Sequence, residues 1–288
     1  MAVSTGALAG LSQLAGRYDV ILSDVWGVLH NGIEPYPGAA EALAAYRAAG
    51  GRVVLITNSP RPSPLIGEKL SGMAISSMAY DDIVSSGDVT RSMISRFSGR
   101  TIHYVGPGPI GAQLLEGIDV GLGRAEDADA VLVTDLDTDD DTPDMYEARM
   151  KVWRTRGLPL ICANPDRVVE LGDRLVYCGG ALADRYAELG GEVLMAGKPY
   201  PQIYEAALRL AAQAAGRDVV TNRILAIGDS TRTDAAGAAA TKLDLLFIIS
   251  AIHAGELEAA PGGLAGAVAA LVAPTGARLA GYMPRLVW

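Results

Sequence analysis

The stretch from Ile21 to Gly32 reads ILSDVWGVLHNG, and it sets the expected fold. A short apolar run ends at the carboxylate Asp24, and the bulky Trp26 and a glycine follow it. A run of this length, bounded by turn residues, predicts a buried strand. Asp24 is therefore expected at the carboxyl end of a strand, beside an indole where a second polar group would be more usual.

Short apolar runs alternate with amphipathic segments along the chain. A helical pattern at 37–50 follows the opening strand, then a strand at Arg52–Thr57, then a second helical pattern at 64–73. Such alternation predicts βαβ units on a parallel sheet, so the expected fold class is α/β.

Composition excludes several classes of protein. The chain has 288 residues, half of them hydrophobic, which is enough for one large core or two modest ones. A net charge of −9 argues against a nucleic-acid partner, because phosphate backbones are bound through clustered Lys and Arg. The two cysteines, Cys162 and Cys178, cannot form a disulfide framework and favour a reducing compartment. Without a basic segment before its first apolar residues, or an apolar run long enough to cross a bilayer, the protein is expected in the cytoplasm with no membrane partner.

Polar residues end three of the predicted strands in the same way. Asp24, Thr57-Asn58 and Asp229 each follow an apolar run. The carboxyl ends of parallel strands share one edge of the sheet, so these residues are expected to converge. Carboxylate, hydroxyl and amide groups suit Mg²⁺ and an oxyanion. An Asp after a strand is also a common turn or helix cap, so a single one carries little weight.

Four segments together resemble the motifs of the haloacid dehalogenase (HAD) superfamily, in its class IIA branch of sugar-phosphate, nitrophenylphosphate and phosphoglycolate phosphatases. They are DVWGVLHNG (24–32), VVLITNSPR (53–61), GKPYPQIY (197–204) and IGDSTRTD (227–234). The resemblance implies a Rossmann-like core with a parallel sheet and an inserted α/β cap of the C2 type. The expected core is 1–80 with 196–288, and the expected cap is 81–195.

The resemblance also implies roles for charged residues. Asp24 matches the nucleophile that attacks phosphorus and also binds Mg²⁺. Lys198 matches the cation that neutralises phosphate and nucleophile, Asp229 the second metal carboxylate, and Asp234 the acid that supports the metal shell. A covalent aspartyl-phosphate divides a hard hydrolysis into two steps, and cations offset the repulsion between two anions.

Three further residues complete the expected phosphate site. Thr57 matches the hydroxyl that holds the phosphoryl oxygens, with Asn58 beside it. Arg61 is a candidate for the phosphate or for a substrate acid, although an arginine is more often a surface residue. In the cap, 163–169 and 178–186 are expected to form the substrate-facing edge.

Trp26 departs from the family pattern, which has a second aspartate two residues after the nucleophile. That carboxylate protonates the leaving group and then activates water, and indole cannot exchange protons at neutral pH. The family's metal ligand at this position is the backbone carbonyl, which Trp26 still supplies. His30 is the nearest candidate for proton transfer, and its ordinary alternative is a loop histidine bonded to backbone.

The sequence thus predicts a Mg²⁺-dependent phosphatase for a small phosphorylated metabolite such as a sugar phosphate, slow because Trp26 replaces the acid. The alternative is a protein that binds phosphate esters without turning them over. A third interpretation, nucleotide binding, rests only on GPGPIG at 106–111, where Pro109 lacks the N–H that such a loop directs at a pyrophosphate. A homodimer is left open.

Overall fold

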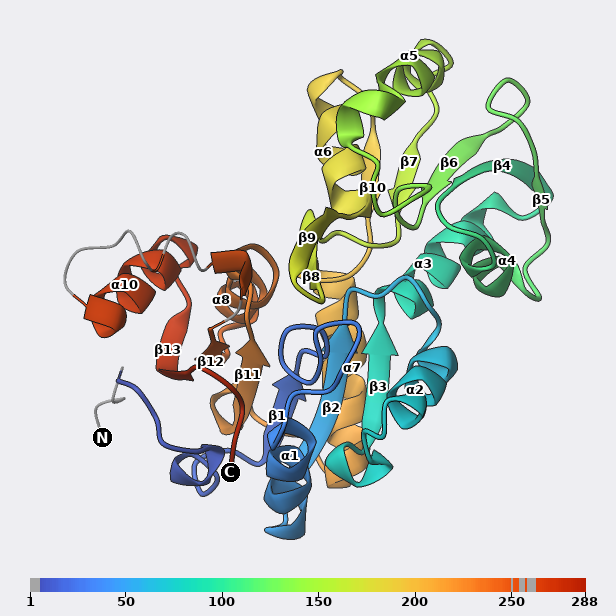
Figure 1. Ribbon diagram of the computed structural model, residues 1–288. Coiled ribbons are helices and arrows are strands. Elements are labelled where there is room, and N and C mark those ends of the chain that lie inside the picture. Colours follow the sequence, from blue (N-terminus) through green and yellow to red (C-terminus); the bar gives the residue numbers. More distant parts are fainter. Residues whose placement is uncertain (1–5, 250, 254–256, 258–262) are drawn as a thin grey trace.

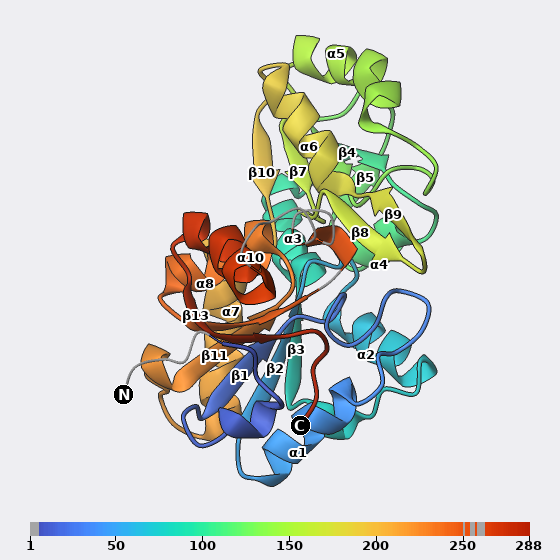
Figure 2. The ribbon, with the colours of Figure 1, turned by 60° about the vertical axis from the view of Figure 1, so that its left-hand side comes forward.

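The computed structural model describes residues 6–249, 251–253, 257 and 263–288. It contains two parallel sheets, each with helices packed on it, and the second unit stands above the first in Figures 1 and 2. The predicted α/β class, with a Rossmann-like sheet and an inserted second sheet, is confirmed.

The first sheet has the strand order β13-β12-β11-β1-β2-β3, and all its pairs are parallel. Its strands are β1 (Val20–Ser23), β2 (Arg52–Thr57), β3 (Asp82–Ser85), β11 (Ile224–Gly228), β12 (Asp244–Ile248) and β13 (Arg278–Met283). The chain starts at β1, builds outward to β3, and later returns to build outward on the other side from β11. The order therefore reverses between β1 and β11, and ligands of such sheets bind beyond the carboxyl ends at this point.

Helices cover both faces of this sheet. One face carries α1 (Ala39–Ala48) and α2 (Ser63–Gly72); the other carries α7 (Pro201–Ala215), α8 (Ala236–Thr241) and α10 (Gly263–Val272). Side chains of a strand alternate between faces, so Ile21 of β1 packs in one apolar cluster while Val20 and Leu22 pack in the other. Burial on both faces explains why the strand sequences are continuous apolar runs.

The second sheet has the order β10-β7-β6-β4-β5 and is also parallel. Its elements are β4 (Arg100–Val105), α4 (Ile110–Leu115), β5 (Val120–Leu122), β6 (Ala130–Val133), α5 (Glu147–Thr155), β7 (Leu160–Cys162), α6 (Gly179–Glu188) and β10 (Val193–Met195). An antiparallel hairpin, β8 (Val168–Leu171) and β9 (Arg174–Tyr177), projects from it toward the first unit.

The boundary between the core and the second unit lies later in the chain than the sequence predicts. A boundary after residue 80 assigns β3 to the cap, but β3 pairs with β2 from Val54↔Asp82 to Thr57↔Ser85. Ser85 then caps α3 (Ser86–Ile94), whose Asp88 completes a capping box. The strands of the second sheet lie between Arg100 and Met195, and the chain returns to the core through Ala196 and Gly197.

The structure also bears on the cysteines and on the expected absence of membrane spans. Cys162 and Cys178 are both buried and free. Within the described residues, none of the helices combines the length and the apolar character needed to cross a bilayer.

Candidate active site

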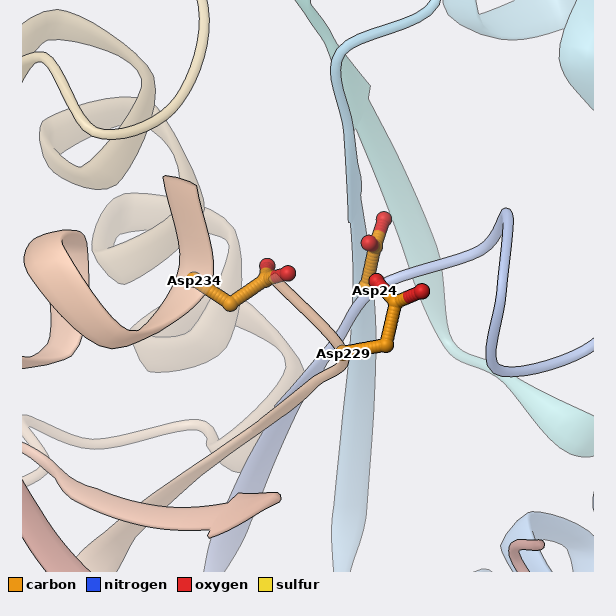
Figure 3. Close-up of side chains that lie close together, drawn as sticks. All are labelled: Asp24, Asp229 and Asp234. Carbon is orange, nitrogen blue, oxygen red and sulfur yellow. The ribbon is translucent and has the colours of Figure 1, made fainter. Parts of the chain in front are cut away.

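Three buried carboxylates converge at the switch in strand order. Asp24 follows β1, Asp229 follows β11, and Asp234 lies in the π-helical turn Thr231–Ala235 after it. Their ligand oxygens all lie within 4.8 Å of one another. Figure 3 shows the three side chains close together, with Asp234 directed toward Asp24 and Asp229. Two neighbouring strands and a turn thus bring together residues from distant parts of the sequence.

Two glycines allow the backbone to approach this cluster. A Cβ on Gly27, whose φ is 84°, would overlap the Asp229 carboxylate. A Cβ on Gly228 would overlap the Asp234 side chain. Because Gly27 follows Trp26, this close approach also brings the backbone at Trp26 near Asp229. The predicted metal ligand, the backbone carbonyl of Trp26, would have to lie there.

Lys198 links two of the three acids. Its Nζ lies 2.7 Å from Asp24 Oδ1 and 2.7 Å from Asp234 Oδ1, and the side chain is almost wholly buried. Burial alone would lower the pKa of Lys198, but the charges of Asp234 and Asp24 raise it. The ammonium is therefore charged at any physiological pH.

The acid cluster fits a divalent cation. Burial, and then the charge of Asp234, raises the pKa of Asp24 well above its usual range, even though Lys198 opposes the rise. Carboxylates pressed together away from water are stabilised when a cation lies between them. Clustered carboxylate oxygens are the donors that Mg²⁺ prefers, and Asp24, Asp229 and Asp234 would hold it.

Thr57 is the last residue of β2 and Asn58 follows it, at the same edge of the sheet as the carboxylates. Their side chains have different roles. The Thr57 hydroxyl accepts a hydrogen bond from Ser59 N at 3.2 Å, so its own proton remains to be donated. The Asn58 amide binds the backbone of Lys198 at both ends: Oδ1 accepts from Lys198 N at 2.6 Å, and Nδ2 donates to Lys198 O at 3.3 Å. Asn58 thus positions the lysine, whatever it contributes to a substrate.

A cavity of about 450 Å³ opens above these residues, between the core and the second unit. A volume of this size suits a small molecule. Arg61 lines it from the core, and 164–169 line it from the cap. Of the second segment that the sequence predicts for the substrate-facing edge, 178–186, only Cys178 lines the cavity. Asp166 of this segment accepts a hydrogen bond from Asn58 Nδ2 at 2.9 Å, and burial raises its pKa. The two units therefore share the site.

Trp26 lines the cavity and ties the core to the hairpin. Its Nε1 donates to the carbonyl oxygen of Glu170 in β8 at 2.6 Å. The Lys69 ammonium of α2 lies 4.6 Å from the centroid of the indole ring, in cation–π contact. Trp26 is thus held by both units.

His30 does not line this cavity. It is buried, its Nδ1 accepts a hydrogen bond from Gly32 N at 2.9 Å, and its ring packs against the edge of Trp26. Burial, and then the charge of Lys69, lowers its pKa to about 3. An imidazole so placed stays neutral and bonded to backbone, and the geometry gives no support to the predicted proton transfer.

Sequence reasoning missed three residues of the site, Lys69, Glu170 and Asp135. Lys69 appears in the sequence as one polar position of an amphipathic helix, and Glu170 as one of several acids in the cap. Asp135 follows an apolar run of the cap; it lines the cavity, and burial raises its pKa to about 7. No local pattern marks Lys69 or Glu170 as part of the site, because their places depend on how the two units meet. Asp135 does carry a local signal, since it follows an apolar run as Asp24 does.

Comparison with known proteins gives the family. A model described as haloacid dehalogenase-like hydrolase matches residues 21–119, and one described as HAD-hydrolase-like matches 195–273. A hydrolase of the haloacid dehalogenase-like family from Brucella suis is 40% identical, with a TM-score of 0.86, over 96% of this chain and 99% of its own. No curated protein gives a significant match. The chain belongs to the haloacid dehalogenase-like hydrolases, and its inserted second sheet has the class IIA arrangement.

More distant solved structures share the fold. A possible sugar phosphatase of the HAD superfamily from Cytophaga hutchinsonii is 20% identical over 96% of this chain and 97% of its own, with a TM-score of 0.78. A glycerol phosphate phosphatase from Mycobacterium tuberculosis, solved with magnesium, is 22% identical over 88% of this chain and 78% of its own, with a TM-score of 0.62.

Proposed function

We propose that this protein is a Mg²⁺-dependent phosphatase that hydrolyses a small phosphorylated metabolite, such as a sugar phosphate, through an aspartyl-phosphate on Asp24. The observation that carries the proposal is the ion-pair arrangement at the strand ends, in which Lys198 contacts Asp24 and Asp234 beside Asp229. The phosphatases among the solved structures with the same fold support it.

The contacts of Asp24 support one of its two carboxylate oxygens as the attacking atom. Val25 N donates to Asp24 Oδ1 at 2.7 Å, and Lys198 Nζ contacts the same oxygen. Both contacts fall on Oδ1, so Oδ2 is the oxygen that attacks phosphorus. Fixing the carboxylate in advance removes much of the entropy cost of bringing nucleophile and ester together.

Charge stabilisation comes from groups already in place. The ammonium of Lys198 offsets the repulsion between the nucleophile and the phosphoryl oxygens, and the free proton of Thr57 is donated to one of those oxygens. When bound by Asp24, Asp229 and Asp234, Mg²⁺ would supply further positive charge against the equatorial oxygens. Asp234 also keeps Lys198 aimed at Asp24.

The proposed site lacks a general acid–base group at the position of Trp26. Trp26 stands where the family's acid–base carboxylate is expected, and it cannot protonate a leaving alkoxide or activate water. A positioned general acid or base contributes ~10²–10⁴-fold, so esters with poor leaving groups should turn over slowly. Esters whose leaving group is stable as an anion need no acid in the first step and should be the better substrates.

The second candidate function is a protein that binds phosphate esters with little or no turnover. Trp26 is the observation that favours it, because the indole lines the cavity, is held there by the hydrogen bond to Glu170 O, and offers no acid–base group. Release of inorganic phosphate separates the two functions, since a pure binding protein holds the ester intact.

The test of the proposal is hydrolysis of 4-nitrophenyl phosphate with Mg²⁺. The native protein should release nitrophenolate, and Asp24→Asn should lower kcat by on the order of 10⁴-fold or more, because it removes the nucleophile. Asp119→Asn, at an exposed cap position, is the matched control and should keep native kcat. Equal rates in native and Asp24→Asn proteins would contradict the proposal, and native protein that binds the ester without releasing phosphate would favour the binding function.

A further inference from the structure

Lys69 is held at the wall of the cavity. It lies in α2, its ammonium rests on the Trp26 ring at 4.6 Å from the centroid, and the side chain is half-buried. Trp26 is itself fixed by the bond from its Nε1 to Glu170 O. The ammonium is therefore presented in a defined place, which a flexible surface lysine does not achieve.

A second cation, Arg61, lines the same cavity. Arg61 follows β2, and its Nη1 donates to the neutral amide oxygen of Gln113 at 3.3 Å. Burial, and then the positive charge of Arg61, lowers the pKa of Lys69. Two like charges partly out of water destabilise each other, and an anion beside them would relieve both.

Other basic groups around the cavity already have acidic partners. Arg232 lies 3.6 Å from Asp184 Oδ2, Arg167 pairs with the same carboxylate, and Lys198 pairs with two acids. No carboxylate of the described residues lies within ion-pair distance of Arg61 or Lys69. Glu170, which lines the cavity too, instead accepts a hydrogen bond from Tyr36 on its Oε2 at 3.1 Å.

We propose that Lys69 and Arg61 form a second anion site, so that the substrate carries another anionic group, a carboxylate or a second phosphate, besides the phosphoryl group at Asp24. This inference rests on the proposed function, because it places the phosphoryl group at the carboxylate cluster. It also explains what Trp26 contributes, since the ring that replaced the acid is the platform that holds the Lys69 ammonium in the cavity.

The test uses three phosphonates with the same two-carbon spacer and different ends. They are propylphosphonate, 3-phosphonopropanoate and ethane-1,2-bisphosphonate, which end in methyl, carboxylate and phosphonate. Their Kd values are measured by calorimetry on the native protein with Mg²⁺, so the result does not require turnover. We expect at least one charged-ended ligand to bind about 10-fold more tightly than propylphosphonate, because hydrogen bonds between charged groups are the strong ones.

Lys69→Met should reduce that preference about 10-fold, and Arg61→Met should reduce it as well, so that one variant can decide if the other does not fold. Lys151→Met is the control, since its exposed ammonium on α5 pairs with Glu147 and lies away from the cavity. A preference for the carboxylate alone identifies a phosphorylated acid; a preference for the bisphosphonate alone identifies a bisphosphate.

Equal Kd values for the three ligands, or equal changes for all three in Lys69→Met, would overturn the second anion site. A different result would contradict the proposed function, namely no release of phosphate from 4-nitrophenyl phosphate by the same preparation. If the native protein binds the ligands with charged ends more tightly but releases no phosphate, the second anion site is supported and the phosphatase function is contradicted.

Discussion

At the scale of single residues, the proposed function depends most on Trp26. In that proposal Asp24 attacks phosphorus, and Lys198 and the other two carboxylates support the charge stabilisation. The indole of Trp26 cannot act as the general acid or base of the proposed reaction.

Trp26→Asp should raise kcat for alkyl phosphates about 10-fold or more, because it supplies a carboxyl group that protonates the leaving alkoxide. The gain should be smaller for 4-nitrophenyl phosphate, whose leaving group needs no acid. The measurement is steady-state kinetics with both esters and Mg²⁺. Trp26→Phe, which keeps an aromatic ring and adds no acid, is the control and should show no gain. Fast native turnover of alkyl phosphates, slowed by Trp26→Asp, would show that this view of Trp26 is wrong.

The local sequence around a site residue decides whether that residue can be predicted. Asp24, Thr57 and Asp229 each end an apolar run, so strand prediction alone places them on one edge of a parallel sheet. Lys69 is one polar position of α2, and its direction depends on how α2 packs against the loop that holds Trp26. Side-chain direction of that kind is set by tertiary packing and not by the helix sequence.

At the scale of elements, the β8–β9 hairpin holds the cap to the core at the mouth of the site. Three hydrogen bonds join it to the loop after β1: Trp26 Nε1 to Glu170 O, Tyr36 Oη to Glu170 Oε2 at 3.1 Å, and Gly172 N to Asn31 O at 3.3 Å. The hairpin is two-stranded and mostly exposed or half-buried, and a lone two-stranded hairpin is marginally stable, so these contacts should matter for its stability.

The double variant Trp26→Phe/Tyr36→Phe should speed amide hydrogen exchange across β8 and β9 by about 30-fold, because it removes two hydrogen bonds worth ~1 kcal/mol each. Mass spectrometry of peptides from 168–177 measures this. Tyr46→Phe is the control, since its hydroxyl donates to Tyr18 O inside the core, far from the hairpin, and its loss should leave the hairpin unchanged. Unchanged exchange in the double variant would mean that these contacts do not hold the hairpin.

The strands show what periodicity can and cannot predict. The strand predicted at Arg52–Thr57 is confirmed as β2 with the same bounds. β3 is missed as a core strand because Asp82, Ser85 and the serines and acids after it look like a linker. Its place is fixed by pairing with β2, and Ser85 and Ser86 are buried there by neighbours from distant parts of the sequence.

At the scale of the whole molecule, the carboxylate cluster should couple metal binding to stability. Two strands and a turn of the core supply Asp24, Asp229 and Asp234, so unfolding disperses the site. A ligand that binds only the folded state stabilises it by mass action.

Saturating Mg²⁺ should therefore raise Tm by about 5 °C relative to EDTA, since a ligand at 100 times its Kd contributes ~2.7 kcal/mol. Asp229→Asn should abolish most of this shift, whereas Asp119→Asn should retain it. Differential scanning calorimetry in Mg²⁺ and in EDTA gives the measurement. The metal assignment fails if Asp229→Asn gains as much from Mg²⁺ as the native protein does.

The crossings between core and cap lie beside each other. Ser86 begins α3 on the way out, Gly197 marks the way back, and a Cβ on Gly197 would lie 2.9 Å from Ser86 Oγ. A rigid tilt of the cap about these crossings would therefore have its axis close to Lys198 and the carboxylate cluster, while α5 lies far from it at the outer end of the cap in Figures 1 and 2. A rotation that moves α5 through a wide arc would move the chain crossings very little, so a distance label on α5 would magnify small rotations of the cap.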